Sequence, residues 1–179
     1  MQKRLLLFTV IIISAASIKT LCQSTQSPTL VYSDFSIKLP QDWVTTRVSD
    51  GILCGMEGME RKDGAKPRLF VEAIADTGQT NAELKALFLS RFSNFNIVAQ
   101  EEETTLIAHQ NAYRIELKYR LQHQPDSRLE QVIMYTSWFA IRVASQKKIY
   151  LLRLMDIADD LFDGLKSASP ALQSFKPTH

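Results

Sequence analysis

The residue types best suited to chemistry are concentrated in the segment Cys54-Gly55-Met56-Glu57-Gly58-Met59. A cysteine thiolate and a methionine thioether are soft ligands of the kind that Cu(I) prefers. On a strand, the Cys54 and Met56 side chains would lie on the same face, because successive residues alternate between faces. The alternative is that both fill the core while the two glycines permit a β-bulge. The sequence favours this alternative over copper binding, and no zinc-type spacing accompanies the pair.

The usual signatures of nucleophilic catalysis are missing from the sequence. No Gly-x-Ser-x-Gly motif is present, and a pairing of Cys54 with His109 or His123 would lie in no local family signature. His109 is in the turn-like segment Ala-His-Gln-Asn, His123 is in a polar loop, and His179 is the last residue. We therefore expect no enzyme activity, no catalytic residue, no metal ligands and no cofactor.

Two acidic runs and one glycine-containing turn resemble ligand sites only superficially. The acids at 156–160 lack the alternation, glycine and terminal glutamate of an EF-hand, and they suit the start of a helix. Glu101-Glu102-Glu103 is predicted to be a solvated turn. The segment 63–66 has one glycine and no Walker-type Ser or Thr, so no nucleotide site is expected.

Four basic residues surround an Asp-Gly turn between two predicted strands. They are Arg61, Lys62, Lys66 and Arg68, which we call the basic tip. Such a cluster could contact an acidic partner or lipid headgroups, although ordinary solubility also explains it.

The first 22 residues have the pattern of a secretory signal peptide. Lys3 and Arg4 precede the apolar run 5–13 and the small residues 14–17. The run is shorter than the roughly 20 residues that a membrane-spanning helix needs, so removal is favoured over anchoring. We therefore expect an exported protein, either periplasmic or extracellular.

The end of the signal peptide has more than one interpretation. Cleavage after Cys22 leaves small residues at the two inspected positions, and cleavage after Ser24 is an alternative. Acylation of Cys22 would make a lipoprotein, but Leu21 stands where lipoproteins prefer a smaller residue. Removing residues 1–22 takes away three basic residues and no acidic one, so the net charge falls from +2 to −1.

The remaining chain has the composition of an ordinary globular domain. The full sequence of 179 residues is 45% hydrophobic and 22% charged, with 6 Gly and 6 Pro, which is typical of globular proteins. Residues 23–29 are polar and are predicted to be a flexible leader, and residues 30–177 are predicted to form a single domain. The charge balance excludes a broad nucleic-acid surface. Cys54 would be the one remaining thiol, so no intramolecular disulfide is expected.

Apolar periodicity predicts an α+β fold. Strands are predicted at 35–39, 50–58, 69–75, 113–122, 129–143 and 149–155, and a further extended segment begins at 95–98. Gln110-Asn111 is predicted to be a turn. Segment 113–122 alternates apolar and polar residues without exception, and the last three strands are predicted to form an antiparallel meander.

Two helices are predicted to cover the sheet. The first runs from about 81 to 92 after a capping-box pattern at 80–83. The second begins near the acids at 159–163, and Ser169-Pro170 is predicted to open one more turn. Trp43 follows a Pro-Gln-Asp turn and is expected to cover the edge of the core.

This order of elements resembles the PsbP-like superfamily, which includes PsbP, the DcrB-type exported proteins of bacteria and a Ran-binding branch in eukaryotes. The residues that carry the resemblance are the opening segment 32–43, the helix at 81–92, the three long strands and the closing Leu172-Gln173-Ser174-Phe175-Lys176. The resemblance implies an α/β/α sandwich around a central antiparallel sheet. It implies no reaction.

Members of this superfamily generally act as accessory or docking proteins. The resemblance therefore implies an exported, non-catalytic accessory or docking protein of the bacterial cell envelope, which is expected to be a monomer. It would bind an envelope or secreted protein through a sheet edge, the basic tip or a tryptophan-bearing face, and it would contact a membrane only if Cys22 is acylated. The alternative is a small-molecule or Cu(I) binding protein, or a cryptic hydrolase, with its site between sheet and helix around Cys54, Met56 and Met59.

Overall fold

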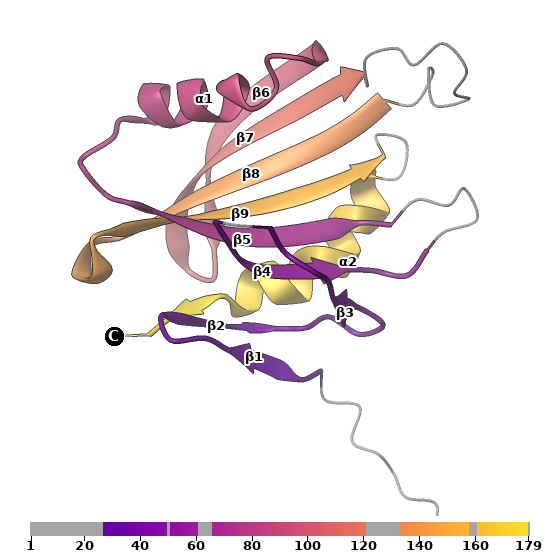
Figure 1. The fold of residues 1–179 in the computed structure, drawn as a ribbon, viewed down its shortest axis with the longest axis vertical. Helices are drawn as coiled ribbons and strands as arrows, with labels where there is room; N and C mark the ends of the chain where they lie inside the picture. The colour runs from indigo at the N-terminus through magenta and orange to yellow at the C-terminus, as the bar shows by residue number, and fades with distance from the viewer. Residues whose placement is uncertain (1–26, 50, 61–65, 121–132, 158–160, 179) are drawn as a thin grey trace, which may run out of the picture.

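The central element is a seven-stranded antiparallel sheet with the strand order β3-β4-β5-β9-β8-β7-β6. The computed structural model describes residues 27–49, 51–60, 66–120, 133–157 and 161–178 (Figure 1). The strands are β3 (Val44–Thr45), β4 (Ile52–Glu57), β5 (Arg68–Ala75), β6 (Asn96–Ile107), β7 (Gln110–Arg120), β8 (Ile133–Val143) and β9 (Lys148–Ile157). The predicted meander of the last three long strands is confirmed.

A second, three-stranded sheet joins the two ends of the described chain. It consists of β1 (Thr29–Val31), β2 (Phe35–Lys38) and β10 (Lys176–Pro177), with β2 in the middle. This sheet was not predicted, because two of its strands are only two or three residues long. The first strand begins at Thr29, one residue before the predicted start of the domain. Residues 1–26, which include the predicted signal peptide and Cys22, lie outside the described residues.

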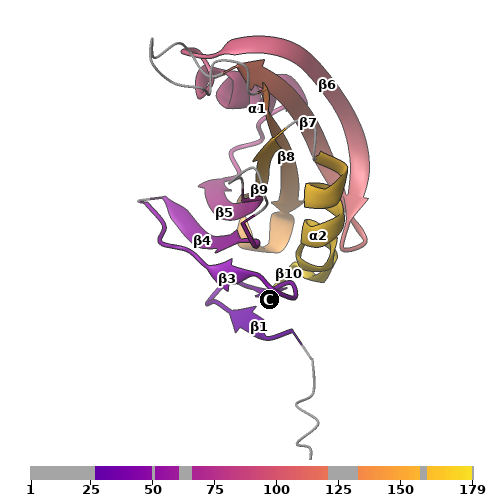
Figure 2. The same cartoon turned by 90° about the vertical axis from the view of Figure 1, so that its right-hand side faces the viewer.

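The two helices cover opposite faces of the central sheet. Helix α1 (Asn81–Ser90) packs against β7, β8 and β9 on one face, and α2 (Leu161–Ser174) packs with β2 on the other. Figures 1 and 2 show this arrangement from two directions, with β6 and β7 curving round toward α2. The predicted α+β fold, an α/β/α sandwich, is confirmed.

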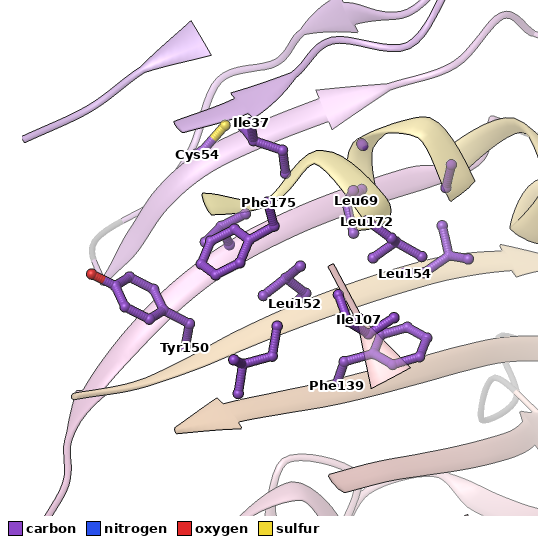
Figure 3. Close-up of a cluster of buried hydrophobic side chains, with 14 of the residues drawn as sticks. Ile37, Cys54, Leu69, Ile107, Phe139, Tyr150, Leu152, Leu154, Leu172 and Phe175 are labelled. Carbon is purple, nitrogen blue, oxygen red and sulfur yellow. The ribbon is translucent and has the colours of Figure 1, made fainter. Parts of the chain in front are cut away.

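The larger hydrophobic core lies on the α2 face and is shown in Figure 3. Phe35 of β2, Tyr150 of β9 and Phe175 after α2 form a trio of rings with centroids 5.2 to 5.7 Å apart. Such edge-on and tilted contacts add to the stabilisation from burial. The trio therefore ties the small sheet to the central one.

The second core lies beneath α1. Phe88 stacks on Trp138 of β8, with ring centroids 4.5 Å apart, and Phe92 packs on Tyr119 at 4.9 Å. The predicted capping box is present: the Thr80 amide donates to Glu83 at 2.7 Å, and the Glu83 amide donates to the Thr80 hydroxyl at 3.3 Å. The cap fixes where the helix begins and so how its apolar face meets the sheet.

The strand predicted at 113–122 from its alternating residues is present in the structure as β7. Tyr113, Ile115, Leu117 and Tyr119 are all buried beneath α1, as the alternation predicts. Residues 121 and 122, and 129–132 of the next predicted strand, lie outside the described residues. The period-two pattern therefore fixed both the element and the face that it buries.

Two predicted turns are wrong. Glu101, Glu102 and Glu103 lie inside the continuous strand β6, which is the edge of the sheet and almost wholly exposed. An edge strand tolerates such charges because one side of its backbone faces solvent. The hairpin that follows turns at Ala108 and His109, which have positive φ values of 49° and 64°. The predicted turn at Gln110-Asn111 is therefore the start of β7.

The end of α2 also differs from the prediction. Pro170 does not open a separate turn but lies inside one continuous helix. Proline removes one backbone donor in a helix interior, so this helix tolerates a missing hydrogen bond at Pro170. Its neighbours Ala168, Ala171 and Leu172 are buried in the α2-face core, which compensates for that loss.

Within the described parts of the chain, no helix has the length and apolar character needed to cross a bilayer.

Candidate arginine and glutamate site

Three strands place an arginine between two aromatic rings on the α1 face of the sheet. Arg153 of β9 is directly opposite Phe70 of β5 in one pairing and opposite Trp138 of β8 in the other. Its guanidinium carbon lies 5.0 Å from the Phe70 ring centroid and 5.2 Å from that of Trp138. Cation–π contacts of this kind hold the guanidinium in a fixed position.

A second arginine reaches the same place from the end of α1. Arg91 is the C-cap residue of the helix, and its guanidinium carbon lies 4.8 Å from the Trp138 ring centroid. Its Nη1 donates to the Glu72 carboxylate of β5 at 2.6 Å. Because Glu72 is 7% exposed, this charge-assisted hydrogen bond is partly shielded from water.

Glu72 is shared unequally between the two arginines. The distance from Arg153 Nη2 to Glu72 Oε1 is 3.8 Å, beyond the range of a hydrogen bond. Arg153 Nε is buried and has no hydrogen-bond partner among the described residues. Burial lowers the pKa of the Arg153 guanidinium, Arg91 lowers this pKa further, and Glu72 raises it. Arg153 is therefore the less well compensated of the two cations.

These groups lie at the wall of an open hollow of about 400 Å³, which we call the arginine hollow. Its lining includes Arg91, Arg153, Glu72, Ser49, Ile52 and Ile74. The Arg91 side chain is 31% exposed and the Arg153 side chain 19%. Both arginine side chains are therefore partly exposed, while the carboxylate between them is almost fully covered.

The arginine hollow is equipped for recognition of an anion. Two guanidinium groups and one carboxylate leave one uncompensated positive charge among the described residues. The described lining contains no cysteine or histidine, and Ser49 has no histidine beside it to activate its hydroxyl. The arrangement can bind and orient an acidic group.

The sulfur-containing residues that the sequence singled out do not converge. Cys54 and Met56 share one face of β4, as expected, and both are buried in the α2-face core. Figure 3 shows Cys54 in this core. Met59 is 67% exposed and lies apart from them, beyond the end of β4. Burial raises the pKa of the Cys54 thiol, although the Tyr32 hydroxyl donates a hydrogen bond to it and acts in the opposite direction.

The described half of the basic tip is neutralised by neighbouring acids. Lys66 lies 3.7 Å from Glu57 and 3.6 Å from Glu60, and Arg68 lies 3.4 Å from Glu57. Arg61 and Lys62 lie outside the described residues. The tryptophans offer no exposed surface either, because Trp43 is 5% exposed and Trp138 is wholly buried. Neither tryptophan side chain is therefore itself exposed for contact with a partner.

The remaining candidates behave as structural residues or cannot be placed. His109 is exposed in the hairpin turn, as predicted, whereas His123 and His179 lie outside the described residues. Asp156 is not a helix-start acid: it is a buried residue of β9, and its carboxylate lies against Gly164 of α2. No group of three or more His, Cys, Asp or Glu side chains suited to a metal occurs among the described residues.

Sequence reasoning missed Glu72, Arg91 and Arg153. Two of them carried a signal, since Glu72 interrupts the apolar segment 69–75 and Arg153 interrupts the apolar segment 149–154. A charge within a strand that is buried on both faces needs a partner, so each could have been marked as a member of a polar cluster. Arg91 carried no such signal, because it follows an amphipathic helix where basic residues are common.

Comparison with known proteins identifies the fold. No protein-family model matches the sequence, and no curated protein matches it. Among solved structures, LpqN of Mycobacterium tuberculosis, described as involved in cell envelope biogenesis, matches with a TM-score of 0.57 and 12% identity, over 86% of this chain and 91% of that one. The Ran-binding protein Mog1p of Saccharomyces cerevisiae matches with a TM-score of 0.52 and 7% identity, over 85% and 95%.

A third match is cyanobacterial PsbP (CyanoP) of Synechocystis sp. PCC 6803. It has a TM-score of 0.49 and 13% identity, over 86% of this chain and 94% of that one. The matches to LpqN and Mog1p have TM-scores above 0.5, so the expected fold is confirmed. At these identities the likeness concerns the fold alone.

Proposed function

We propose that this chain is an exported, non-catalytic accessory protein of the bacterial cell envelope that docks on a protein partner through the arginine hollow. The observation that carries the proposal is the position of Arg153, held between two rings at the wall of an open hollow, with its Nη2 3.8 Å from the carboxylate of Glu72 and so beyond hydrogen-bond distance. Arginines in such partly desolvated positions are frequent anchors of protein interfaces.

Three further features support this assignment. The signal-peptide pattern of residues 1–22 favours export to the periplasm or the extracellular space. LpqN, a protein of the same fold, is described as acting in cell envelope biogenesis. The groups that the hollow brings together are suited to recognition, which favours a binding role over an enzymatic one.

Capture of the partner from envelope extracts tests the proposal. The purified protein is immobilised beside an Arg153→Gln variant, and the retained proteins are identified by mass spectrometry. The matched control is Arg120→Gln, which removes an exposed arginine from β7, on the face opposite the hollow. We expect one defined partner that the parent and the control retain and that Arg153→Gln loses. Retention that is equal in all three samples would contradict docking through the hollow.

The basic tip provides a second, separate arm. Changing Arg61, Lys62, Lys66 and Arg68 to Glu reverses its charge without touching the hollow. Because Lys66 and Arg68 already have acidic neighbours, we expect this variant to retain the same partner. Loss of the partner in this variant alone would indicate that the partner docks on the basic tip and not in the arginine hollow.

A small-molecule binding role remains the alternative, and the size of the hollow favours it over Cu(I) binding. A hollow of about 400 Å³ is within the range of small-ligand sites. A Cu(I) site at Cys54 and Met56 would require opening the core that encloses both side chains. Copper titration of the parent and of Cys54→Ser, followed by thermal unfolding, tests that alternative, because a bound ligand raises the melting temperature.

A further inference from the structure

The donors of Arg153 are the starting point for identifying what enters the hollow. A guanidinium carries five N–H donors in a planar fork, and this fork matches the two oxygens of a carboxylate. In Arg153, the nearest described carboxylate oxygen is 3.8 Å away and Nε has no partner. The ring contacts satisfy the faces of the guanidinium, and its Nε is buried. The Nη donors at the end of the fork are therefore the ones left for another group.

The charge of the cluster favours an anion with a single charge. Arg91 is committed to Glu72 through a 2.6 Å hydrogen bond, so one positive charge remains for a ligand. Glu72 is almost fully buried beside both arginines and would repel a second negative charge on the ligand. A carboxylate therefore suits the site better than a phosphate, which carries close to two charges at neutral pH.

The surroundings of Arg153 add an apolar preference. Ile52 and Ile74 line the hollow, and Phe70 lies directly beneath the guanidinium. Val48 lies close to Phe70, since a Cβ at Gly55 would be within 3.3 Å of both, and Val48 is 38% exposed. A carboxylate on an apolar body would therefore gain contacts that a free ion cannot make.

We propose that the arginine hollow binds the carboxylate of a short partner segment, an acidic side chain with apolar neighbours, and that Arg153 is the residue that grips it. This inference rests on the proposed docking function and names the chemistry of the partner. Arg153 meets the carboxylate with its two Nη groups, while Arg91 keeps Glu72 in place. The expected recognition is a planar, two-point contact.

Titration of the purified protein with defined probes tests the inference. The probes are an acetylated and amidated Leu-Glu-Leu peptide, its Leu-Gln-Leu counterpart, acetate and inorganic phosphate. Binding is followed by NMR of the arginine Nε–H groups in protein labelled with ¹⁵N. We expect the glutamate peptide to shift the Arg153 signal in a saturable manner, with an affinity at least tenfold above that of the glutamine peptide, acetate or phosphate.

Variants separate recognition from folding. Arg153→Gln is expected to lose at least tenfold in affinity for the glutamate peptide, and Arg153→Lys, which keeps the charge but not the fork, is expected to recover only part of it. Arg120→Gln is expected to bind like the parent. Amide spectra of each variant show whether it remains folded, and the Lys variant keeps the test informative if the Gln variant unfolds.

Several outcomes would overturn the inference. They are phosphate or acetate binding as tightly as the glutamate peptide, an unmoved Arg153 signal, and an affinity that Arg153→Gln leaves unchanged. Partner capture that depends on Arg153 without carboxylate binding would overturn this inference and leave the docking function standing. Carboxylate binding without any captured partner would overturn the docking function and leave carboxylate recognition by the arginine hollow standing.

Discussion

Single charged residues within apolar strands are the feature on which the proposed function rests. Glu72 and Arg153 occupy positions that would otherwise hold apolar side chains, and burying a charge is costly unless it is paired. The pairing here is incomplete, because Arg91 takes most of Glu72 and Arg153 is left with a distance of 3.8 Å. An incompletely compensated cation at an open hollow is a group whose interactions a ligand would complete.

Replacement of Arg153 should separate binding from stability. Arg153→Met removes the less compensated cation and leaves the pair of Arg91 and Glu72 intact, so the free energy of unfolding should stay the same or rise. Glu72→Gln leaves two close guanidinium groups without their carboxylate and should lower the free energy of unfolding by about 3 kcal/mol. Urea unfolding of both variants measures the difference. A large loss in Arg153→Met would show that Arg153 serves folding.

Among the glycines that the structure describes, Gly164 is the one where an added methyl group would make the closest contact. A Cβ there would lie 2.0 Å from an oxygen of the buried Asp156 carboxylate. Gly164→Ala should therefore destabilise the protein by about 1 to 2 kcal/mol, although alanine is the better helix former. A double-mutant cycle with Asp156→Ala, followed by thermal unfolding, checks the cause. An equal cost of Gly164→Ala in both backgrounds would contradict it.

At the scale of elements, sequence patterns predicted structure wherever a strand or helix buries one face. The alternation of β7 and the capping box of α1 were both confirmed. The failures lie where tertiary context overrides local preference. A turn was predicted at Glu101 to Glu103 because charges rarely fill a strand, yet these residues lie in the exposed edge strand β6. Pro170 was predicted to begin a further helical turn, but it lies within α2.

The cap of α1 should make the protein sensitive to acid. Hydrogen bonds from the Thr80 amide and hydroxyl lower the pKa of Glu83, so its carboxylate stabilises the fold above the ordinary pKa of 4.5. That contribution is lost as the pH falls through the depressed value. Glu83→Ala should therefore lower the melting temperature at pH 7 and have little effect at low pH.

Thr80→Ala is the matched control for this pH dependence. Its hydroxyl accepts a hydrogen bond from the Glu83 amide, which does not titrate, so part of its cost should remain at every pH. Thermal unfolding of both variants between pH 2 and pH 7 gives the comparison. Identical pH profiles for the two variants would contradict the assignment.

The charges of β6 should keep the exposed edge of the sheet from pairing with another chain. Glu101 and Glu103 are exposed, and Glu103 accepts a 2.6 Å hydrogen bond from Arg114. Replacing both with Val should produce concentration-dependent association, whereas the parent and Thr104→Val should sediment as monomers. Analytical ultracentrifugation measures this. A monomeric double variant would show that the edge is protected in another way.

At the scale of the whole molecule, the fold could be predicted from the sequence and the site could not. Periodicity and helix signals predicted the α+β elements, because each follows from burial along one element. The family resemblance implied the sandwich. The arginine hollow depends on strand register, which sets Phe70, Arg153 and Trp138 in one row across three strands. Register between distant segments cannot be read from any one of them. The sequence therefore directed attention to Cys54, which the structure places in the core.

The two faces of the sheet are used differently. The α2 face carries the larger core and the contacts that close the small sheet. On the other face, α1 covers parts of β7, β8 and β9, while the segment at Ser49 and Ile52 and the residues of β5 border the open hollow. We therefore expect the α1 face to be the side on which a partner docks.

The most direct test of docking on this face is site-specific photocrosslinking in living cells of the source organism. A photoreactive amino acid replaces Val48, which is 38% exposed beside Phe70, or the exposed Lys166 of α2 on the opposite face. We predict one defined adduct with an envelope protein from position 48 and none from position 166, and loss of that adduct when Arg153→Gln is added. An absent adduct at position 48, or equal adducts at both positions, would contradict the account.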